Sequence, residues 1–255
     1  MAPSNGLLTE VSSGIASMLP ERLVAAAIRG VYPRVEPELA RIADFVPLGG
    51  TAVDVGAWYG PWTRRLRRRA ERVVAVEPNA QLARCIKAAF GDVRVVEAVA
   101  SDHPGTAELF LPKAGPAVGT SSLEYGDGQS ITVSRVTIDG LDLTDVRFMK
   151  IDVEGHELPT LRGAAETIRR DGPVLLVEVE ERIQPVEPIV GLLQGWGYRA
   201  YVLPRDHWVP LAEFDLVGHQ RTTIARVRQS FARRVIAPRP RYVNSVLFRH
   251  DRHSA

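Results

Sequence analysis

Two stretches in the first third of the chain carry residues that could bind a nucleoside. In the run TAVDVGAWYG, an apolar segment breaks at Gly56 and continues to Gly60, where a helix can begin. The next apolar run, at 72–76, ends on Glu77. Because ligands of open parallel sheets bind beyond the carboxyl ends of adjacent strands, we expect the Gly56 turn and Glu77 to share one crevice. A ligand could lie against bare glycine backbone there, and the two oxygens of Glu77 could accept both hydroxyls of a ribose.

The length and composition of the chain favour one cytoplasmic domain. With 255 residues, of which 45% are hydrophobic, the chain can bury a full core. No apolar run approaches the roughly 18 residues of a membrane span, and the N-terminus lacks a basic start followed by an apolar block, so neither membrane insertion nor secretion is expected. The only cysteine, Cys85, suits a reducing compartment. Only three of the 32 basic residues are lysines, a bias typical of genome composition, and no nucleic-acid partner is expected.

Apolar runs that alternate with helical spacing predict an α/β fold. After the first two strands, a helix capped by Asn79 is expected to run to Phe90. Further main strands are predicted at 93–96, 147–151, 173–179, 198–203 and 242–248, with helices at 158–170 and 188–195. Together these elements predict a seven-stranded doubly wound sheet with a late antiparallel strand. Period-two spacing over 107–138 predicts an inserted β-hairpin region appended to that sheet.

Two segments lie outside this alternation. Residues 1–46 carry helical spacing in pieces separated by prolines, which predicts an N-terminal helical cap over either the site or a dimer interface. The arginine-rich segment 204–240 lies between the last two strands and is a candidate lid. The sequence therefore predicts a cap at 1–46 and a main domain at 47–255, with a homodimer as one of the two roles left open for the cap.

An ordered set of motifs resembles the FkbM family of S-adenosylmethionine-dependent methyltransferases. The set reads VDVGAWYG, VEPN, EAVASD, MKIDVEGHE, PVLLVEVE, GYRAYVL and NSVLF, and KIDVEGHE is its most specific member. The resemblance covers roughly residues 51–203 and the last strand, and leaves out the first 46 residues and segment 204–240. It implies a Rossmann-like class I methyltransferase sheet. It also implies methyl transfer from the sulfonium of S-adenosylmethionine to an oxygen, usually on a small molecule or a sugar.

The resemblance also implies roles for individual positions. It assigns the cofactor to residues at the ends of the first three strands and of the fourth, namely Asp54, Gly56, Ala57, Gly60, Glu77, Asn79, Ala98, Val99 and Asp152. Within this set, Glu77 and Asn79 match the ribose and adenine end, and Asp152 matches the position nearest the sulfonium and the acceptor. The chain departs from the family at Trp58, where a small polar residue is common. Trp58 is therefore expected to narrow the site or to stack on the acceptor.

Two chemical routes could activate the acceptor oxygen, and the sequence leaves both open. In the first, His156 or a carboxylate near Asp152 acts as a general base, a contribution of about 10² to 10⁴ in rate. In the second, Mg²⁺ or Mn²⁺ lowers the pKa of the acceptor hydroxyl. Asp152, Glu178 and Glu180 follow neighbouring strands about 4.8 Å apart and could be the metal ligands. Against these roles, the two glutamates could pair with arginines and the histidine could cap a helix.

Two other kinds of function are weighed against the methyltransferase. A nicotinamide-dependent oxidoreductase would also need a glycine turn and a following acid, but the GxGxxG pattern does not occur after Gly56. A non-catalytic cofactor-binding module would keep the fold without the activity, and the intact residues Gly56, Glu77 and Asp152 argue against that loss. The preferred hypothesis is a cytoplasmic O-methyltransferase whose acceptor is a saccharide or a related small metabolite.

Overall fold

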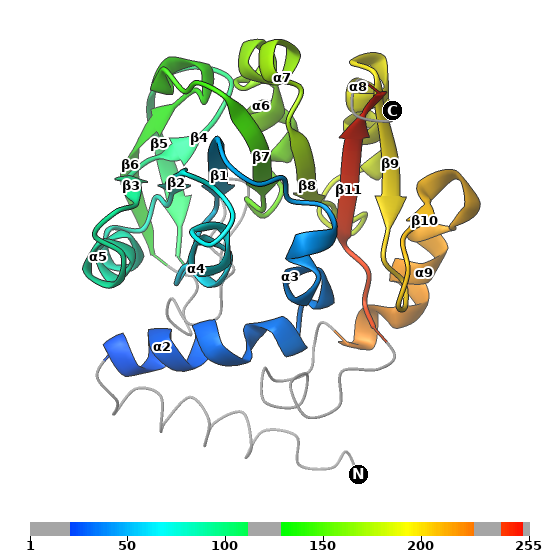
Figure 1. Cartoon of the computed structure of the whole chain (residues 1–255), viewed down its shortest axis with the longest axis horizontal. Coiled ribbons are helices and arrows are strands. Elements are labelled where there is room, and N and C mark those ends of the chain that lie inside the picture. Colours follow the sequence, from blue (N-terminus) through cyan, green and yellow to red (C-terminus); the bar gives the residue numbers. More distant parts are fainter. Residues whose placement is uncertain (1–20, 112–128, 227–240, 252–255) are drawn as a thin grey trace.

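The central feature of the protein is a mostly parallel sheet (Figure 1). A computed structural model describes residues 21–111, 129–226 and 241–251. Eight strands form this sheet in the order β10-β9-β11-β8-β7-β1-β2-β3. Their bounds in chain order are β1 (Thr51–Val55), β2 (Arg72–Val76), β3 (Arg94–Val96), β7 (Val146–Ile151), β8 (Val174–Glu178), β9 (Tyr198–Val202), β10 (Val209–Pro210) and β11 (Ser245–His250). Within these described ranges, no helix is both long and apolar enough to cross a membrane.

The pairing of the strands confirms the predicted fold class. β1 lies between β2 and β7, and β2–β3 and β7–β8 continue the parallel arrangement on either side. β11 runs antiparallel to both β8 and β9, as the late antiparallel strand should. The predicted strand count was one too low, because the two-residue strand β10 adds an antiparallel edge next to β9. A strand of that length carries no periodicity that a sequence could reveal.

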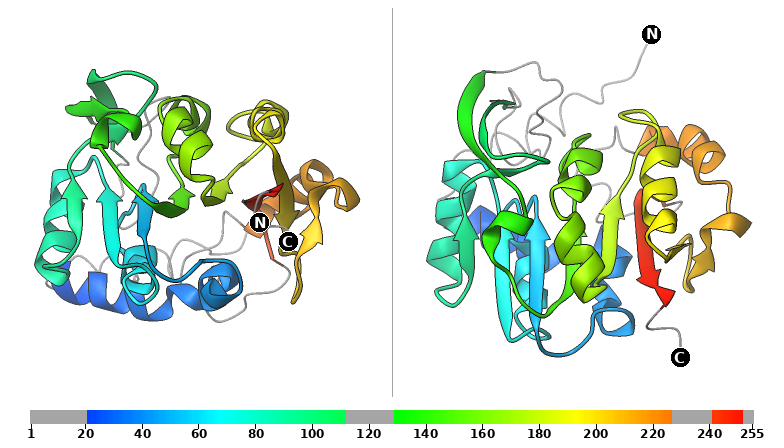
Figure 2. Two further views of the ribbon diagram at one scale, coloured as in Figure 1. Left: turned by 45° about the horizontal axis from the view of Figure 1, so that its top comes forward. Right: turned by 90° about the horizontal axis from the view of Figure 1, so that it is seen from above.

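Helices cover both faces of the sheet because the inner strands are apolar on both sides. All five residues of β1 are buried. On β7, Met149 packs into the core under α6 (Glu157–Arg162), α7 (Ala165–Asp171) and α8 (Val186–Gly195). Its neighbour Phe148 packs into the core on the opposite face with α3 (Pro37–Ala40) and α4 (Pro61–Leu66). This alternation is the two-residue period of a strand buried between two layers, and the left view of Figure 2 shows those layers.

Two predicted elements differ in the structure. The single helix expected at 158–170 is two helices, α6 and α7, which are separated at Gly163. A Cβ at this glycine would lie 1.8 Å from the Ser101 carbonyl oxygen, so the chain approaches β4 (Val99–Ala100) too closely for a side chain. The insert forms the predicted antiparallel pair, β5 (Gly105–Phe110) and β6 (Ser130–Val136). However, the pair joins β4 in a separate three-stranded sheet instead of extending the main one (Figure 2).

The described segment before β1 runs from the edge where the parallel strands end, at α2, across one face of the sheet toward the edge where they begin. It comprises α2 (Glu21–Val31), η1 (Tyr32–Arg34), α3 and η2 (Ile42–Asp44). Ala25 and Ile28 of α2 pack on Tyr59 in the turn after β1 and on Leu82 in the first turn of α5 (Ala80–Ala89). The predicted helical pieces between residues 7 and 18 lie outside the described residues. Within the described part of the cap, α2 therefore lies against the edge at which a ligand is expected, and α3 and η2 cover a face of the sheet.

The first part of the candidate lid segment is tied to the sheet. It contains β10, η5 (Leu211–Glu213), α9 (Leu216–Thr223) and η6 (Ile224–Arg226). The buried side chain of Gln220 on α9 donates to the carbonyl oxygens of Val179 and Val243, which adjoin β8 and β11. Its amide oxygen accepts from the Glu181 N–H. Residues 227–240 of the segment lie outside the described residues, and the lid function stays a prediction.

Candidate active site

The turn after β1 brings two strand ends into contact. Gly56 has φ +77°, and a Cβ there would lie 1.8 Å from the backbone oxygen of Asp152. Its N–H donates to the Val76 carbonyl at 2.9 Å, which joins the turn to the end of β2. Gly60, with φ +78°, begins α4. Glycine at position 56 is therefore required for the ends of β1, β2 and β7 to meet at one point.

The carboxylate of Glu77 is fixed beside this turn by backbone donors. The Trp58 N–H donates to Oε2 at 2.7 Å, and the Asn79 N–H donates to Oε1 at 2.9 Å. Burial raises the pKa of Glu77 to about 7, against the opposing effect of these two N–H groups. Each oxygen of a carboxylate has a second acceptor direction. Glu77 can therefore keep both backbone bonds and still accept hydroxyl hydrogens.

The other residues predicted to bind the cofactor lie along the same half of the edge. Ala57, Ala98 and Val99 are buried, and Val99 packs with Leu109 and Val133 of the small sheet. The side chain of Asn79 accepts from the N–H groups of Gln81 and Leu82, and so caps α5. Asp54 is buried on β1, where Thr63 Oγ1 donates to its Oδ2 at 2.5 Å. Asp54 Oδ1 is buried without a hydrogen-bond partner.

The other half of the edge contains a buried lysine that the sequence analysis did not assign. Lys150 on β7 is 5% exposed, and its Nζ lies 2.8 Å from Asp152 Oδ2. Burial alone would lower the pKa of Lys150, but Asp152, Glu36 and other nearby carboxylates raise it overall. The lysine therefore remains a cation among acids. A lysine directly after Phe148 and Met149 in a predicted strand was the available sequence signal. In the structure, the register pairs Lys150 with Asp54.

A second unassigned residue, Glu36, enters this half from the N-terminal segment. Tyr32 Oη donates to Glu36 Oε1 at 3.1 Å, and Trp62 Nε1 donates to Oε2 at 2.6 Å. Burial, with a contribution from Asp152, raises the pKa of Glu36 to about 7. One oxygen each from Glu36, Asp152 and Glu178 lie within 4.8 Å of one another. No local pattern around Glu36 pointed to the site, because only the tertiary fold brings it there.

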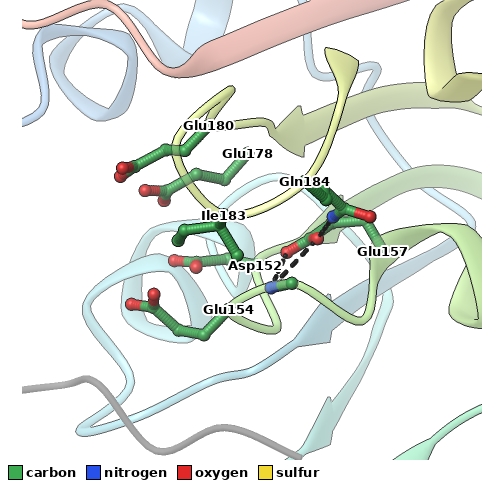
Figure 3. Close-up of a pocket in the computed structure, with 8 residues that line it drawn as sticks. Asp152, Glu154, Glu157, Glu178, Glu180, Ile183 and Gln184 are labelled. Atoms are coloured by element: carbon green, nitrogen blue, oxygen red, sulfur yellow. Dashed lines mark hydrogen bonds between the residues drawn. The ribbon is translucent and has the colours of Figure 1, made fainter. Parts of the chain in front are cut away.

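Five acidic side chains line a pocket at the ends of β7 and β8. They are Asp152, Glu154, Glu157, Glu178 and Glu180, and Ile183 and Gln184 complete the wall together with Gly155. In Figure 3 the carboxylates of Asp152, Glu154, Glu178 and Glu180 point to the same side of the pocket. Burial and the neighbouring acids raise the pKa values of Glu154 and Glu178 well above the usual range. The pocket is thus lined mainly by carboxyl groups, and the charged forms of Glu154 and Glu178 are disfavoured in it.

Other groups engage these acids: Lys150 pairs with Asp152, and the Asn244 side chain donates to Glu178 and Glu180. Glu180 pairs with Arg182 and accepts from Tyr242 Oη at 3.2 Å. Glu157 accepts from the N–H groups of Val153 and Gly155 and from the Gln184 side chain (Figure 3). The structure therefore brings Asp152 and Glu178, two of the three predicted metal ligands, into one convergent group. Glu36, not Glu180, is the third member of that group among the described residues.

His156, the predicted general base, lies to one side of this pocket. Its ring is largely buried just before α6, and Nε2 is 3.0 Å from the hydroxyl of Ser101 after β4. It is not one of the residues that line the acidic pocket described above. A catalytic role for His156 stays a prediction.

The aromatic residues after Gly56 pack against the N-terminal segment. The ring centroids of Trp58 and Tyr32 are 5.5 Å apart, and those of Trp58 and Tyr59 are 5.2 Å apart. Tyr59 is buried under α2. Trp58 is thus positioned between the glycine turn and η1, which is consistent with the expectation that it narrows the site.

A parallel sheet whose carboxyl edge carries a glycine turn and a following acid is typical of nucleotide-binding α/β proteins. Within that class, the methyltransferase FkbM domain matches residues 52–200, and the chain belongs to the FkbM methyltransferase family. This match confirms the resemblance found in the sequence, and it leaves Glu36 and the rest of the N-terminal segment outside the domain. No curated protein matches the sequence.

Solved structures with a similar fold include other methyltransferases. A methyltransferase FkbM from Methylobacillus flagellatus KT has a TM-score of 0.51 and 16% identity over 79% of this chain and 44% of that chain. The chain thus covers less than half the length of that protein. Precorrin 8w decarboxylase from Methanobacterium thermoautotrophicum has a TM-score of 0.45 and 12% identity over 84% and 89% of the two chains. An S-adenosylmethionine-dependent O-methyltransferase from Thermotoga maritima has a TM-score of 0.43 and 13% identity over 84% and 65%.

Proposed function

We propose that this protein is an S-adenosylmethionine-dependent O-methyltransferase whose acceptor is a hydroxyl of a saccharide or a related small metabolite. The observation that carries the proposal is the Glu77 carboxylate, which two backbone N–H groups hold beside the Gly56 turn. Membership in the FkbM methyltransferase family supports methyl transfer in general. The choice of a saccharide hydroxyl rests on the family resemblance, and neither the oxidoreductase nor the binding-module alternative has an observation in its favour.

The residues at the ends of β1 and β2 fit the cofactor. Glu77 can accept the ribose hydroxyls, and the buried oxygen Asp54 Oδ1, which lacks a partner, can accept from the ammonium of the methionine part. When bound, S-adenosylmethionine supplies an electrophilic methyl group on its sulfonium. The chain has to hold that group in line with the acceptor oxygen and exclude water.

The acids at the ends of β7 and β8 could bind and deprotonate the acceptor. The acceptor O–H would donate to Asp152, whose other oxygen is paired with Lys150. The bound cofactor would supply the methyl group and keep the electron pair of the carbon–sulfur bond, and a carboxylate of the cluster would accept the hydroxyl proton. The base route is favoured because cations of the chain, Lys150 and Arg182, already pair with Asp152 and Glu180. Mg²⁺ or Mn²⁺ at Asp152, Glu178 and Glu180 stays a prediction.

Substitution of Asp152 tests the proposal. We expect the Kd of Asp152→Asn for S-adenosylmethionine to stay within about twofold of the wild-type value, because the residues at the ends of β1 and β2 are unchanged. Transfer of labelled methyl to hydroxylated acceptors should fall by about 10² to 10⁴ in kcat, the usual contribution of a positioned base. Asp92→Asn, which alters an exposed ion pair with Arg67, is the matched control and should leave both measurements unchanged. Full activity of Asp152→Asn would remove Asp152 from the mechanism.

Chelation separates the two activation routes in the same assay. The purified wild-type chain is treated exhaustively with a chelator and then assayed with labelled S-adenosylmethionine. The base route predicts an unchanged rate. A rate that falls and returns on addition of Mg²⁺ or Mn²⁺ would replace the base route with the metal route.

A further inference from the structure

We propose that Glu36, which precedes the FkbM domain, binds an acceptor hydroxyl together with Asp152 and Glu178. The N-terminal segment would then form part of the acceptor site and help to choose the acceptor. This inference rests on the proposed methyl transfer and adds to it a residue and a preferred chemistry of the acceptor. The family match begins only at residue 52, so no residue of this segment is assigned by it.

The first support is that the backbone around Glu36 is anchored on both sides. Before it, Ala25 and Ile28 of α2 pack on Tyr59 and Leu82 at the glycine turn and α5. After it, Leu39 and Phe45 pack with Trp62 in the core below β7. Buried clusters on both sides of Glu36 in the sequence therefore hold its backbone at the edge of the sheet.

The second support is the way in which the Glu36 carboxylate is held. Its donors, Tyr32 Oη and Trp62 Nε1, are neutral, and each occupies a different oxygen. A carboxylate oxygen accepts more than one hydrogen bond, so both oxygens retain acceptor capacity. Because one of them lies within 4.8 Å of oxygens of Asp152 and Glu178, a hydroxyl between these residues could donate to any of the three.

A comparison with Glu38 shows why Glu36 does not look like a purely structural acid. Glu38 is fully buried and pairs with Arg241, which also donates to the Leu203 carbonyl oxygen. That arrangement joins α3 to the C-terminal part of the chain. Glu36 is only half-buried, and its carboxylate lies next to other acids at the proposed site of reaction.

The charges around Glu36 indicate which acceptors would bind. Glu36, Asp152 and Glu178 share one nearby cation, Lys150, which is already paired with Asp152. A phosphate or carboxylate on the acceptor would meet three carboxyl groups whose nearby cation is already paired, whereas neutral hydroxyls can donate to carboxyl oxygens. We therefore expect a neutral polyhydroxylated acceptor to be preferred over its phosphorylated counterpart.

The experiment uses the purified full chain, labelled S-adenosylmethionine, and a panel of neutral methyl glycosides with their sugar-phosphate counterparts. For Glu36→Gln we expect the KM of the best neutral acceptor to rise at least 10-fold, while the Kd for S-adenosylmethionine stays within twofold. Tyr32→Phe keeps the ring but removes one donor to Glu36, and should raise the same KM by about threefold. Asp44→Asn, in an exposed ion pair of the same segment, should match the wild type.

The possible outcomes distinguish this inference from the proposed function. Wild-type kinetics in Glu36→Gln, or a preference of the wild type for the sugar phosphates, would overturn the inference and leave the methyltransferase proposal standing. Joint loss of cofactor affinity and thermal stability in Glu36→Gln would show a structural role and also overturn it. A wild-type chain that binds no S-adenosylmethionine, or transfers methyl to no acceptor in the panel, would overturn both proposals.

Discussion

Beside the ends of β1 and β2 the Glu77 carboxylate is held by backbone N–H groups, whereas at the ends of β7 and β8 Asp152 and Glu36 are held by other side chains. Glu77 accepts hydrogen bonds from the N–H of Trp58, in the turn after β1, and from the N–H of Asn79, just after β2. Asp152 instead depends on Lys150, and Glu36 depends on Tyr32 and Trp62. We call these two regions the cofactor half and the acidic half.

The difference matters because backbone donors and side-chain charges respond differently to change. A backbone N–H does not titrate, so in the cofactor half only the carboxyls change charge, and the shape of the turn fixes the donors that hold Glu77. The acidic half balances like charges at short range around Lys150 and Arg182, and its free energy depends on how many carboxyls are ionised. We therefore expect steric substitutions to damage the first half and electrostatic substitutions to damage the second.

The largest expected effect comes from Lys150→Met, which removes the buried cation of the acidic half. Without it, Asp152 and its neighbours lose their nearest positive charge, and the free energy of unfolding at pH 8 should fall by about 3–5 kcal/mol. Burial already raises the pKa of Glu36 to about 7, so its stabilising contribution is complete below its unfolded pKa and is lost as the pH rises through 7. The deficit of the variant should accordingly be smaller at pH 5 than at pH 8 in urea unfolding.

An exposed lysine gives the matched control for that measurement. Lys87 lies 3.7 Å from Glu97 on the surface, and Lys87→Met should cost only about 0–1 kcal/mol at either pH. Equal destabilisation of Lys150→Met at pH 5 and pH 8 would mean that lost packing, and not uncompensated charge, accounts for the effect.

The next largest effect is expected in the cofactor half from Gly56→Ala. The new Cβ would meet the Asp152 carbonyl oxygen at 1.8 Å in a backbone conformation that suits glycine. We expect a loss of about 3 kcal/mol in unfolding free energy and weaker binding of S-adenosylmethionine in titration calorimetry. Gly91→Ala, where a Cβ meets no atom within 4 Å, is the control and should change stability by less than about 0.5 kcal/mol. Gly56→Ala with wild-type stability would show that the strand ends can move apart freely.

The same contrast explains which parts of the structure could be predicted from the sequence. The parallel strands appear as apolar runs, and the glycine turn and Glu77 follow adjacent runs, so the cofactor half could be read from local patterns. Asp152 and Glu178 follow neighbouring strands and were predicted to lie together for the same reason. The small separate sheet was not predicted, because period-two spacing identifies antiparallel strands but not the sheet that they join.

The missed residues depend on tertiary structure. Glu36 reaches Asp152 only because α2 and α3 pack on separate cores, and no spacing within residues 21–45 records that arrangement. Lys150 could have been noticed as a charge within a buried strand, but its partners become apparent only from the register of β1 and β7. Glu180 was predicted as a ligand from its place after β8, whereas its pairing with Arg182 depends on the conformation of the following turn.

The smallest effect concerns Asn79, which the family resemblance assigns to the cofactor and the structure also uses as a helix cap. Its side-chain oxygen accepts from two N–H groups of α5, while its backbone N–H donates to Glu77. Asn79→Ala should lower the free energy of unfolding by about 1 kcal/mol through loss of the cap. Because the first turn of α5 also positions the N–H that holds Glu77, the affinity for S-adenosylmethionine should fall with it.

Asn79→Ser separates the two roles, since serine is a comparable N-cap but has no side-chain amide. If Asn79 acts on the cofactor through the cap, Asn79→Ser should restore both the unfolding free energy and the Kd for S-adenosylmethionine measured by titration calorimetry. Restored stability with a Kd as weak as that of Asn79→Ala would instead indicate direct contact between the amide and the cofactor. In that case the cofactor half would not be held by backbone groups alone, and its contrast with the acidic half would be one of degree.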